Sequence, residues 1–165
     1  MSSSDRRQFL CLLAALPLGA CGFRPAYAPG GAAAGLLDSV TVEAPLDRNG
    51  FDLVERLEER LGRTKTPTYS LGYRIETSET GLGITPDDTT TRYNINGTVT
   101  FVLRDKATGG ELTAGKVSTF TAFSATGTAV STESARADAY QRLMRLLADQ
   151  IVTRLLATSA EWGAA

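Results

Sequence analysis

Residues 93–103 read YNINGTVTFVL, and apolar side chains occupy every second position from Tyr93 to Leu103 except at Gly97. Successive side chains of a β-strand point to opposite faces, so this spacing gathers the apolar side chains on one face. The stretch is therefore predicted to be a long strand that buries one face in the core, and the other elements must be arranged around it.

Two neighbouring stretches show the same alternation. Downstream, residues 105–110 (DKATGG) have the composition of a turn, and a strand is expected from about Leu112 to Phe123. Its alternation slips near Gly115, where we expect a β-bulge. Upstream, residues 69–76 are predicted to be a half-buried strand. Residues 79–91 (ETGLGITPDDTTT) are polar and contain glycine, so we predict a long loop there.

Two amphipathic stretches predict helices. The first has Asn49 as its expected N-cap and ends at Gly62, with an apolar stripe formed by Leu53, Val54, Leu57 and Leu61. The second has Thr132 as its expected N-cap, and its apolar side chains recur at helical spacing over more than four turns: Tyr140, Leu143, Met144, Leu147, Ile151 and Leu155.

The order of elements indicates the fold class. A short strand at residues 39–43 precedes the first helix, which gives the order β-α-β-β-β-α. A strand–helix–strand unit favours a parallel pair, whereas the later strands favour an antiparallel meander. We therefore predict an α+β domain over residues 36–157, with two helices packed on one face of a mixed four-stranded sheet. The small residues at 158–165 are expected to form a frayed tail.

The N-terminus has the pattern of a lipoprotein signal peptide over residues 1–20. Arg6 and Arg7 precede an apolar segment, FLCLLAALPL at residues 9–18, which ends in Leu-Gly-Ala before Cys21. This pattern predicts cleavage before Cys21 and acylation of its thiol, and two or more acyl chains anchor a protein stably to a membrane. Export by the general secretory route and by the twin-arginine route both remain open. Residues 21–35 are rich in Pro, Gly and Ala and predict a flexible tether.

Composition excludes several classes of function. The chain has no histidine, only two cysteines (Cys11 and Cys21), and a formal net charge of −1. Without histidine a Ser-His-Asp or Cys-His site cannot form, and too few ligands are present for a structural zinc site. The charge gives no reason to expect nucleic-acid binding. The acidic pair Asp87-Asp88 is interpreted as part of a solvated turn. We therefore expect no enzyme activity, no cofactor and no metal site.

Three motifs carry a family resemblance. They are CGFRP at residues 21–25, TRYNINGTV at residues 91–99, and the helical stretch of residues 138–155. Together they resemble the lipopolysaccharide-assembly lipoprotein family (LptE) in its alphaproteobacterial form. Residue 22 is Gly rather than Asp, and by resemblance to the sorting rule of enteric bacteria the lipoprotein is expected on the periplasmic side of the outer membrane.

The resemblance implies a binding function without catalysis. Members plug the lumen of the outer-membrane β-barrel LptD, help it to fold and bind lipopolysaccharide. Basic residues near strand starts and hairpin loops are implied to meet lipid phosphates, and the candidates in this chain are Arg92, Arg104, Lys106 and Lys116. The alternative for these four is that they are ordinary solvated charges. The alternative function is an auxiliary lipoprotein of a periplasmic ABC-type transport system.

Overall fold

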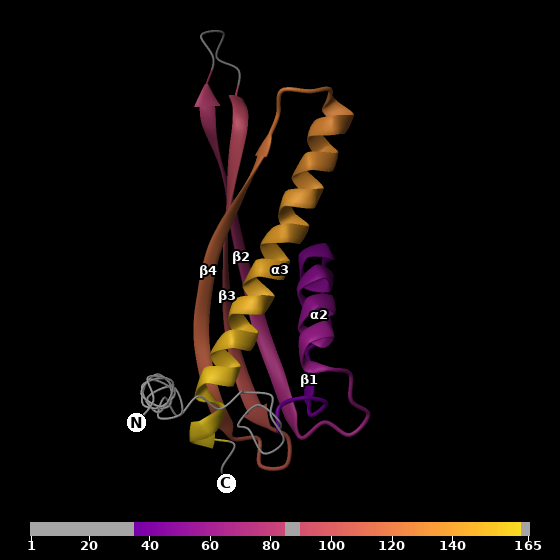
Figure 1. Cartoon of the computed structure of the whole chain (residues 1–165), viewed down its shortest axis with the longest axis vertical. Coiled ribbons are helices and arrows are strands. Elements are labelled where there is room, and N and C mark those ends of the chain that lie inside the picture. Colours follow the sequence, from indigo (N-terminus) through magenta and orange to yellow (C-terminus); the bar gives the residue numbers. More distant parts are fainter. Residues whose placement is uncertain (1–34, 85–89, 163–165) are drawn as a thin grey trace, which may run out of the picture.

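The computed structural model describes residues 35–84 and 90–162. The predicted signal peptide, Cys21, nearly all of the tether and the pair Asp87-Asp88 lie outside these residues. The described elements follow the predicted order β-α-β-β-β-α, which confirms the α+β class (Figure 1). They are β1 (Val40–Val42), α2 (Arg48–Leu61), β2 (Tyr69–Ile84), β3 (Thr90–Asp105), β4 (Glu111–Ser124) and α3 (Ala129–Trp162).

The four strands form one mixed sheet in the order β1-β2-β3-β4. β1 runs parallel to β2, as the strand–helix–strand unit predicts, while β2, β3 and β4 are antiparallel neighbours. β3 therefore lies in the interior of the sheet, with a neighbour on each side. Its position explains why residues 93–103 have the clearest alternation in the chain.

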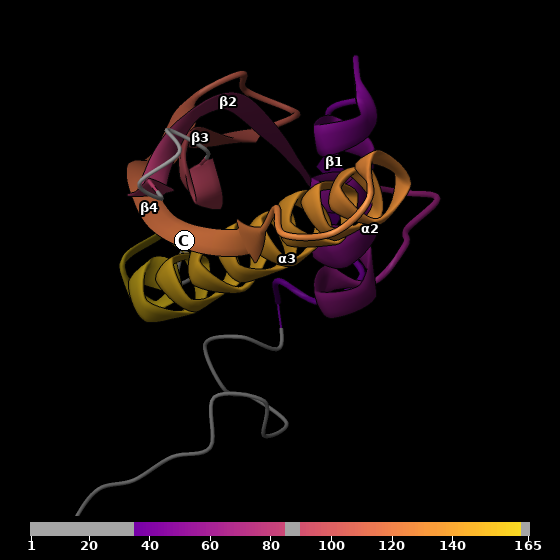
Figure 2. The ribbon, with the colours of Figure 1, turned by 90° about the horizontal axis from the view of Figure 1, so that it is seen from above.

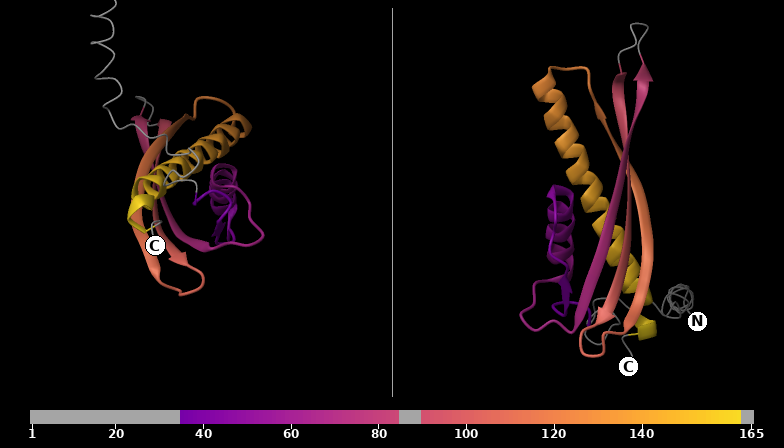
Figure 3. Two further views of the ribbon diagram at one scale, coloured as in Figure 1. Left: turned by 60° about the horizontal axis from the view of Figure 1, so that its bottom comes forward. Right: turned by 180° about the vertical axis from the view of Figure 1, so that it is seen from behind.

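Both helices lie on the same side of the sheet (Figure 2). α3 crosses β3 and β4, and α2 lies beside α3 near β1. Seen from behind, β2, β3 and α3 run the length of the molecule, whereas α2 covers only part of it (Figure 3). The core forms between β3 and α3, and its fully buried side chains include Ile95, Val99 and Leu103 from β3 and Leu143, Leu147 and Ile151 from α3.

The prediction of a long loop over residues 79–91 is wrong for most of that stretch. β2 and β3 continue to pair beyond the apolar part of the hairpin, through Gly81 opposite Tyr93 to Ile84 opposite Thr90. Backbone hydrogen bonds of a hairpin do not require apolar side chains, so the polar composition misled the prediction. The register shifts around Gly83, near the end of the ladder.

The predicted bulge at Gly115 is also misplaced. Gly115 pairs regularly with Phe101, and the register shift of β3 against β4 falls between Leu103 and Arg104 instead. A Cβ atom on Gly115 would lie 2.8 Å from Cζ of Phe101, so the aromatic ring requires glycine at this position. The irregular alternation near Gly115 is therefore caused by side-chain packing and not by a change of register.

Both helices begin earlier than predicted. Asp47, not Asn49, caps α2, because its Oδ1 accepts a hydrogen bond of 2.7 Å from the backbone N–H of Gly50. Thr128 plays the corresponding part for α3, where its Oγ1 accepts from the N–H of Ser131, and Thr132 lies inside the helix.

α3 also continues beyond its predicted end. The expected frayed tail is helical through Trp162, whose ring packs edge-on against Tyr69 with 5.5 Å between the ring centroids. Burial of an aromatic ring stabilises a terminal turn that would otherwise fray.

Candidate functional site

The four basic residues from the sequence analysis do not form one cluster. Arg92, Arg104 and Lys116 occupy even-numbered positions of β3 and β4, and therefore belong to the sheet face opposite the helices. Arg92 and Arg104 lie near opposite ends of β3, separated by about 40 Å at roughly 3.3 Å per residue. No single phosphate group can contact both.

Arg104 and Lys106 lie at the end of the sheet where β3 turns into β4. The guanidinium of Arg104 lies 3.9 Å from the carboxylate of Glu111, and both side chains are about half exposed. Lys106 is exposed in the β3–β4 turn, which is organised by the carboxylate of Asp105. The hydrogen bond from the backbone N–H of Thr108, with further bonds from its hydroxyl and from the N–H of Ala107, holds the pKa of Asp105 below its usual value, although desolvation acts in the opposite direction. The turn therefore presents Lys106 to solvent on an ordered backbone.

Because β4 is the edge strand, Lys116 also borders a groove between β4 and α3, although its even position belongs to the open face. The groove has a volume of about 500 Å³ and is lined by Lys116, Val117 and Ser118 of β4 and by Leu146, Asp149, Gln150, Thr153 and Arg154 of α3. Two cationic residues, Lys116 and Arg154, thus come from the consecutive elements β4 and α3. Leu146 adds an apolar side chain that is 46 % exposed.

The single carboxylate in this groove is already paired. Arg56 of α2 makes two hydrogen bonds of 3.1 Å to Asp149, and Arg60 adds a third of 3.2 Å. The hydrogen bond to Asp149, with a smaller contribution from Glu59, raises the pKa of Arg56. Within residues 35–84 and 90–162, Lys116 and Arg154 have no carboxylate within 4.0 Å. The groove therefore has a positive balance of charge beside an apolar side chain, which suits an anionic amphiphile.

Sequence reasoning missed Arg154 and Arg74. Arg154 lies on the polar side of the last helix, and only the crossing of α3 over β4 brings it to Lys116. Arg74 pairs with Thr100, which pairs in turn with Lys116, so the two cations flank Thr100 across three strands. Both juxtapositions depend on register and helix placement, for which the sequence carries no local signal.

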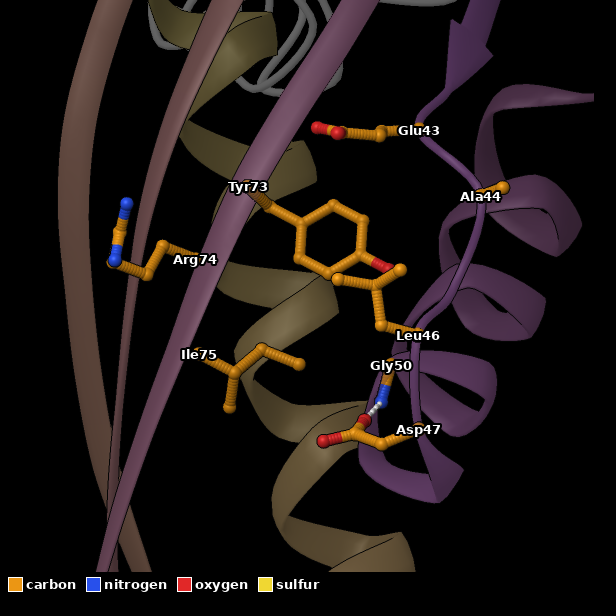
Figure 4. Close-up of a pocket in the computed structure, with 8 residues that line it drawn as sticks. All are labelled: Glu43, Ala44, Leu46, Asp47, Gly50, Tyr73, Arg74 and Ile75. Carbon is orange, nitrogen blue, oxygen red and sulfur yellow. Dashed lines mark hydrogen bonds between the residues drawn. The ribbon is translucent and has the colours of Figure 1, made fainter.

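A second groove, with acidic residues, lies at the opposite edge of the sheet (Figure 4). It has a volume of about 430 Å³ between the β1–α2 connection and β2. Glu43 and Asp47 approach Tyr73 from the connection, whereas the side chain of Arg74 points to the other side of β2. Burial raises the pKa of the Tyr73 hydroxyl, and the negative charges of Glu43 and Asp47 raise it further.

A family model described as lipopolysaccharide-assembly (LptE) matches residues 37–155. The chain belongs to the LptE family. The match covers all six described elements apart from the last residues of α3, so it confirms the resemblance inferred from the three motifs. No curated protein matches the sequence.

Solved structures share the fold of this LptE-family chain. A lipoprotein from Caulobacter crescentus CB15 has a TM-score of 0.65 at 19 % identity, covering 78 % of this chain and 96 % of that one. Rare lipoprotein B from Shewanella oneidensis has a TM-score of 0.57 at 15 % identity, covering 74 % and 96 %. Lipoprotein B from Nitrosomonas europaea has a TM-score of 0.58 at 16 % identity, covering 84 % and 93 %. These identities establish the fold alone.

Family membership gives this LptE-family chain a role in lipopolysaccharide assembly, a process in which the family acts without catalysis. Among the described helices, none combines the length and the apolar character that crossing a membrane requires.

Proposed function

We propose that this chain is an outer-membrane lipoprotein, anchored on the periplasmic side through Cys21, that binds lipopolysaccharide and serves as plug and folding partner of an LptD-type barrel. The family match supports the process. The observation that carries the lipid-binding part is the groove lined by Lys116 and Arg154, with Leu146 exposed beside them. Because the family match is to lipopolysaccharide assembly, the transport alternative is not carried forward.

The groove offers the two kinds of contact that a phosphorylated lipid needs. A guanidinium can bind a phosphate through two parallel hydrogen bonds, and an ammonium adds a compact positive charge. The pairing of Asp149 with Arg56 and Arg60 reduces its repulsion of an incoming phosphate. We propose Arg92, Arg104 and Lys106 as additional, separate contacts for other anionic groups of the same extended ligand.

The open face of the sheet supports the plug function. Short polar side chains occupy much of its centre, including Ser78 on β2, Asn96 and Thr98 on β3, and Ser118 on β4, although the exposed ring of Phe120 lies opposite Asn96. The lumen of a large outer-membrane barrel is polar and filled with water when it is unoccupied. A sheet face of this composition is compatible with such a surface, and the lipid on Cys21 would hold the domain at the same membrane.

Lipopolysaccharide binding by the purified, full-length mature protein tests the groove. Replacing both cations (Lys116→Glu with Arg154→Glu) is expected to weaken binding about tenfold or more, because charged hydrogen bonds contribute about 1.5–3 kcal/mol each. The matched control is Arg145→Glu, an exposed position of α3 outside the groove. Equal affinities for the double variant and the wild type, or an equal loss in the control, would contradict a site in this groove.

A further inference from the structure

β1 covers only the beginning of β2. Val40–Val42 pair with Tyr69–Leu71, and the N–H of Glu43 donates one last bond of 2.9 Å to the carbonyl of Leu71. The chain then turns away into α2, whereas β2 continues to Ile84. Among the residues that the structure describes, no strand pairs with this side of β2 beyond Leu71. β2 is therefore an edge strand over most of its length.

The ladder identifies the backbone groups at this open edge. The N–H of Tyr69 and the carbonyl of Leu71 bond to the β1 side, and backbone groups alternate sides along a strand. The N–H and carbonyl groups of the next odd-numbered residues therefore point to the same side: Tyr73, Ile75, Thr77 and Glu79. Unpaired groups of this kind are a template for pairing with another chain.

A groove lies where a continuation of β1 would run. The acidic groove described above borders β2 at Tyr73, Arg74 and Ile75, and its far wall is the connection from Glu43 to Asp47 (Figure 4). Tyr73 and Ile75 offer partly buried apolar surface on the helix side, and Leu46 is fully exposed at the rim. The space therefore accommodates an added strand and one of its side chains.

Charge indicates which side chain fits. Glu43 and Asp47 both line the groove, and Asp47 already accepts the N-capping bond of α2. Glu43 makes no ion pair within 4.0 Å among the described residues, and its carboxylate lies over Gly72, where an added Cβ would be 3.4 Å from its Oε2 and 4.0 Å from Nη1 of Arg104. The one cation of the lining, Arg74, points away to the open face. A lysine or arginine entering beside Tyr73 would meet two carboxylates, whereas an acidic side chain would be repelled.

We propose that the β2 edge from Tyr73 to Glu79 binds an extended segment of a partner protein as a fifth strand, with a lysine or arginine of that segment in the groove between Tyr73, Glu43 and Asp47. Side chains alternate along a strand, so a preferred segment places an apolar side chain two residues from the basic one, beside Ile75. The site is at the opposite edge of the sheet from the Lys116–Arg154 groove, so it does not depend on lipopolysaccharide binding.

The test uses the full-length mature protein in detergent micelles and a capped peptide of alternating threonine and valine with one central lysine. Amide hydrogen exchange is followed residue by residue with and without the peptide at about millimolar concentration, the affinity range expected of a short strand. The proposal predicts added protection at Tyr73, Ile75 and Thr77. It also predicts binding about tenfold weaker when the peptide lysine is replaced by glutamate.

Two protein variants test separately the backbone hydrogen bonds of the β2 edge and the charge of the groove. Thr77→Pro removes an N–H that faces the open edge and leaves the bonds to β3 in place, so the protein is expected to fold and to lose peptide binding. Glu43→Lys is expected to weaken binding about tenfold through charge alone. Glu111→Lys makes the same charge change at an exposed position at the start of β4, at the other edge of the sheet and outside both grooves, so it is the matched control and should bind normally.

Several results would overturn the proposal. The first is that the peptide adds no amide protection along β2 of the wild-type protein. The second is that the lysine and glutamate peptides bind equally well. The third is that Thr77→Pro and Glu43→Lys both bind the peptide normally. Self-association of the protein through β2, seen as a dimer in sedimentation and abolished by Thr77→Pro, would assign the edge to a second copy of this chain instead.

Discussion

Gly97 shows how one residue determines the distance between the sheet and α3. An ideal Cβ at this position would lie 2.9 Å from Cδ2 of Leu143 and 2.9 Å from Cδ1 of Leu147. Both leucines are fully buried among other core side chains, so neither has free space to move into. The absence of a side chain on the central strand therefore allows α3 to pack closely against β3.

Gly97→Ala is consequently expected to lower the free energy of unfolding by about 1–3 kcal/mol, as overpacking of a tight core does. Urea unfolding followed by circular dichroism measures this change. Gly35→Ala is the matched control, because nothing lies within 4 Å of the added Cβ. Unfolding curves that coincide for Gly97→Ala and the wild type would show that α3 does not pack against β3 as described.

At the scale of elements, the upper part of the β2–β3 hairpin is tied to α3 by polar contacts. Arg136 makes a 3.0 Å ion pair with Glu79, and the hydroxyl of Tyr140 contacts the same carboxylate at 3.3 Å. The guanidinium of Arg136 also lies 5.7 Å from the centre of the Tyr140 ring. The hydrogen bond to Glu79 is the main cause of the raised pKa of Arg136. These contacts hold a polar stretch of hairpin that has little apolar surface to bury.

Arg136→Ala is expected to loosen this end of the hairpin without unfolding the protein. The pair is partly exposed, so its loss should cost about 1 kcal/mol or less in global stability. Amide exchange of residues 77–81 and 92–95 should accelerate, while the core of β3 near Val99 stays protected. Arg145→Ala, an exposed α3 arginine with no described ion pair, serves as control. Unchanged exchange in Arg136→Ala would mean that the backbone ladder alone holds the hairpin.

The β2–β3 hairpin contains both residues whose structure could be predicted from the sequence and residues whose structure could not. Residues 93–103 and the stripe from Leu143 to Leu155 were predictable because burial repeats at the period of the element. Residues 79–84 were not, because their strand is stabilised by backbone pairing with the other arm of the hairpin, which needs no apolar pattern, and by Arg136, which is distant in sequence. For the candidate site, Lys116 was selected in advance, but its neighbour Arg154 emerges only from the crossing of α3 over β4.

At the scale of the whole molecule, the two edges of the sheet differ in chemistry. The β4 edge has a groove with Lys116 and Arg154, whereas the β2 edge has a groove with Glu43 and Asp47. The largely polar open face, which also carries the exposed ring of Phe120, lies between them, and the helices cover the opposite face (Figure 2). Under the two proposals made above, one small domain would bind an anionic lipid at one edge and a basic strand at the other at the same time. Such an arrangement suits a protein that acts by holding partners together, in keeping with the family's part in lipopolysaccharide assembly.

The proposed partnership with the barrel makes a prediction for the living cell. A lipid-anchored plug that helps its barrel to fold is required in proportion to that barrel, so depletion of this protein should lower the amount of correctly folded LptD-type barrel. Lipopolysaccharide should then accumulate on the periplasmic side, and cells should become permeable to large hydrophobic antibiotics.

Barrel abundance in outer-membrane fractions, surface lipopolysaccharide and antibiotic uptake measure these effects, and restored expression of the wild-type chain is the control. Because each effect causes the next, they should appear in that order. Depletion that left barrel abundance and surface lipopolysaccharide at wild-type levels would refute the partnership, whatever the result for the groove of Lys116 and Arg154.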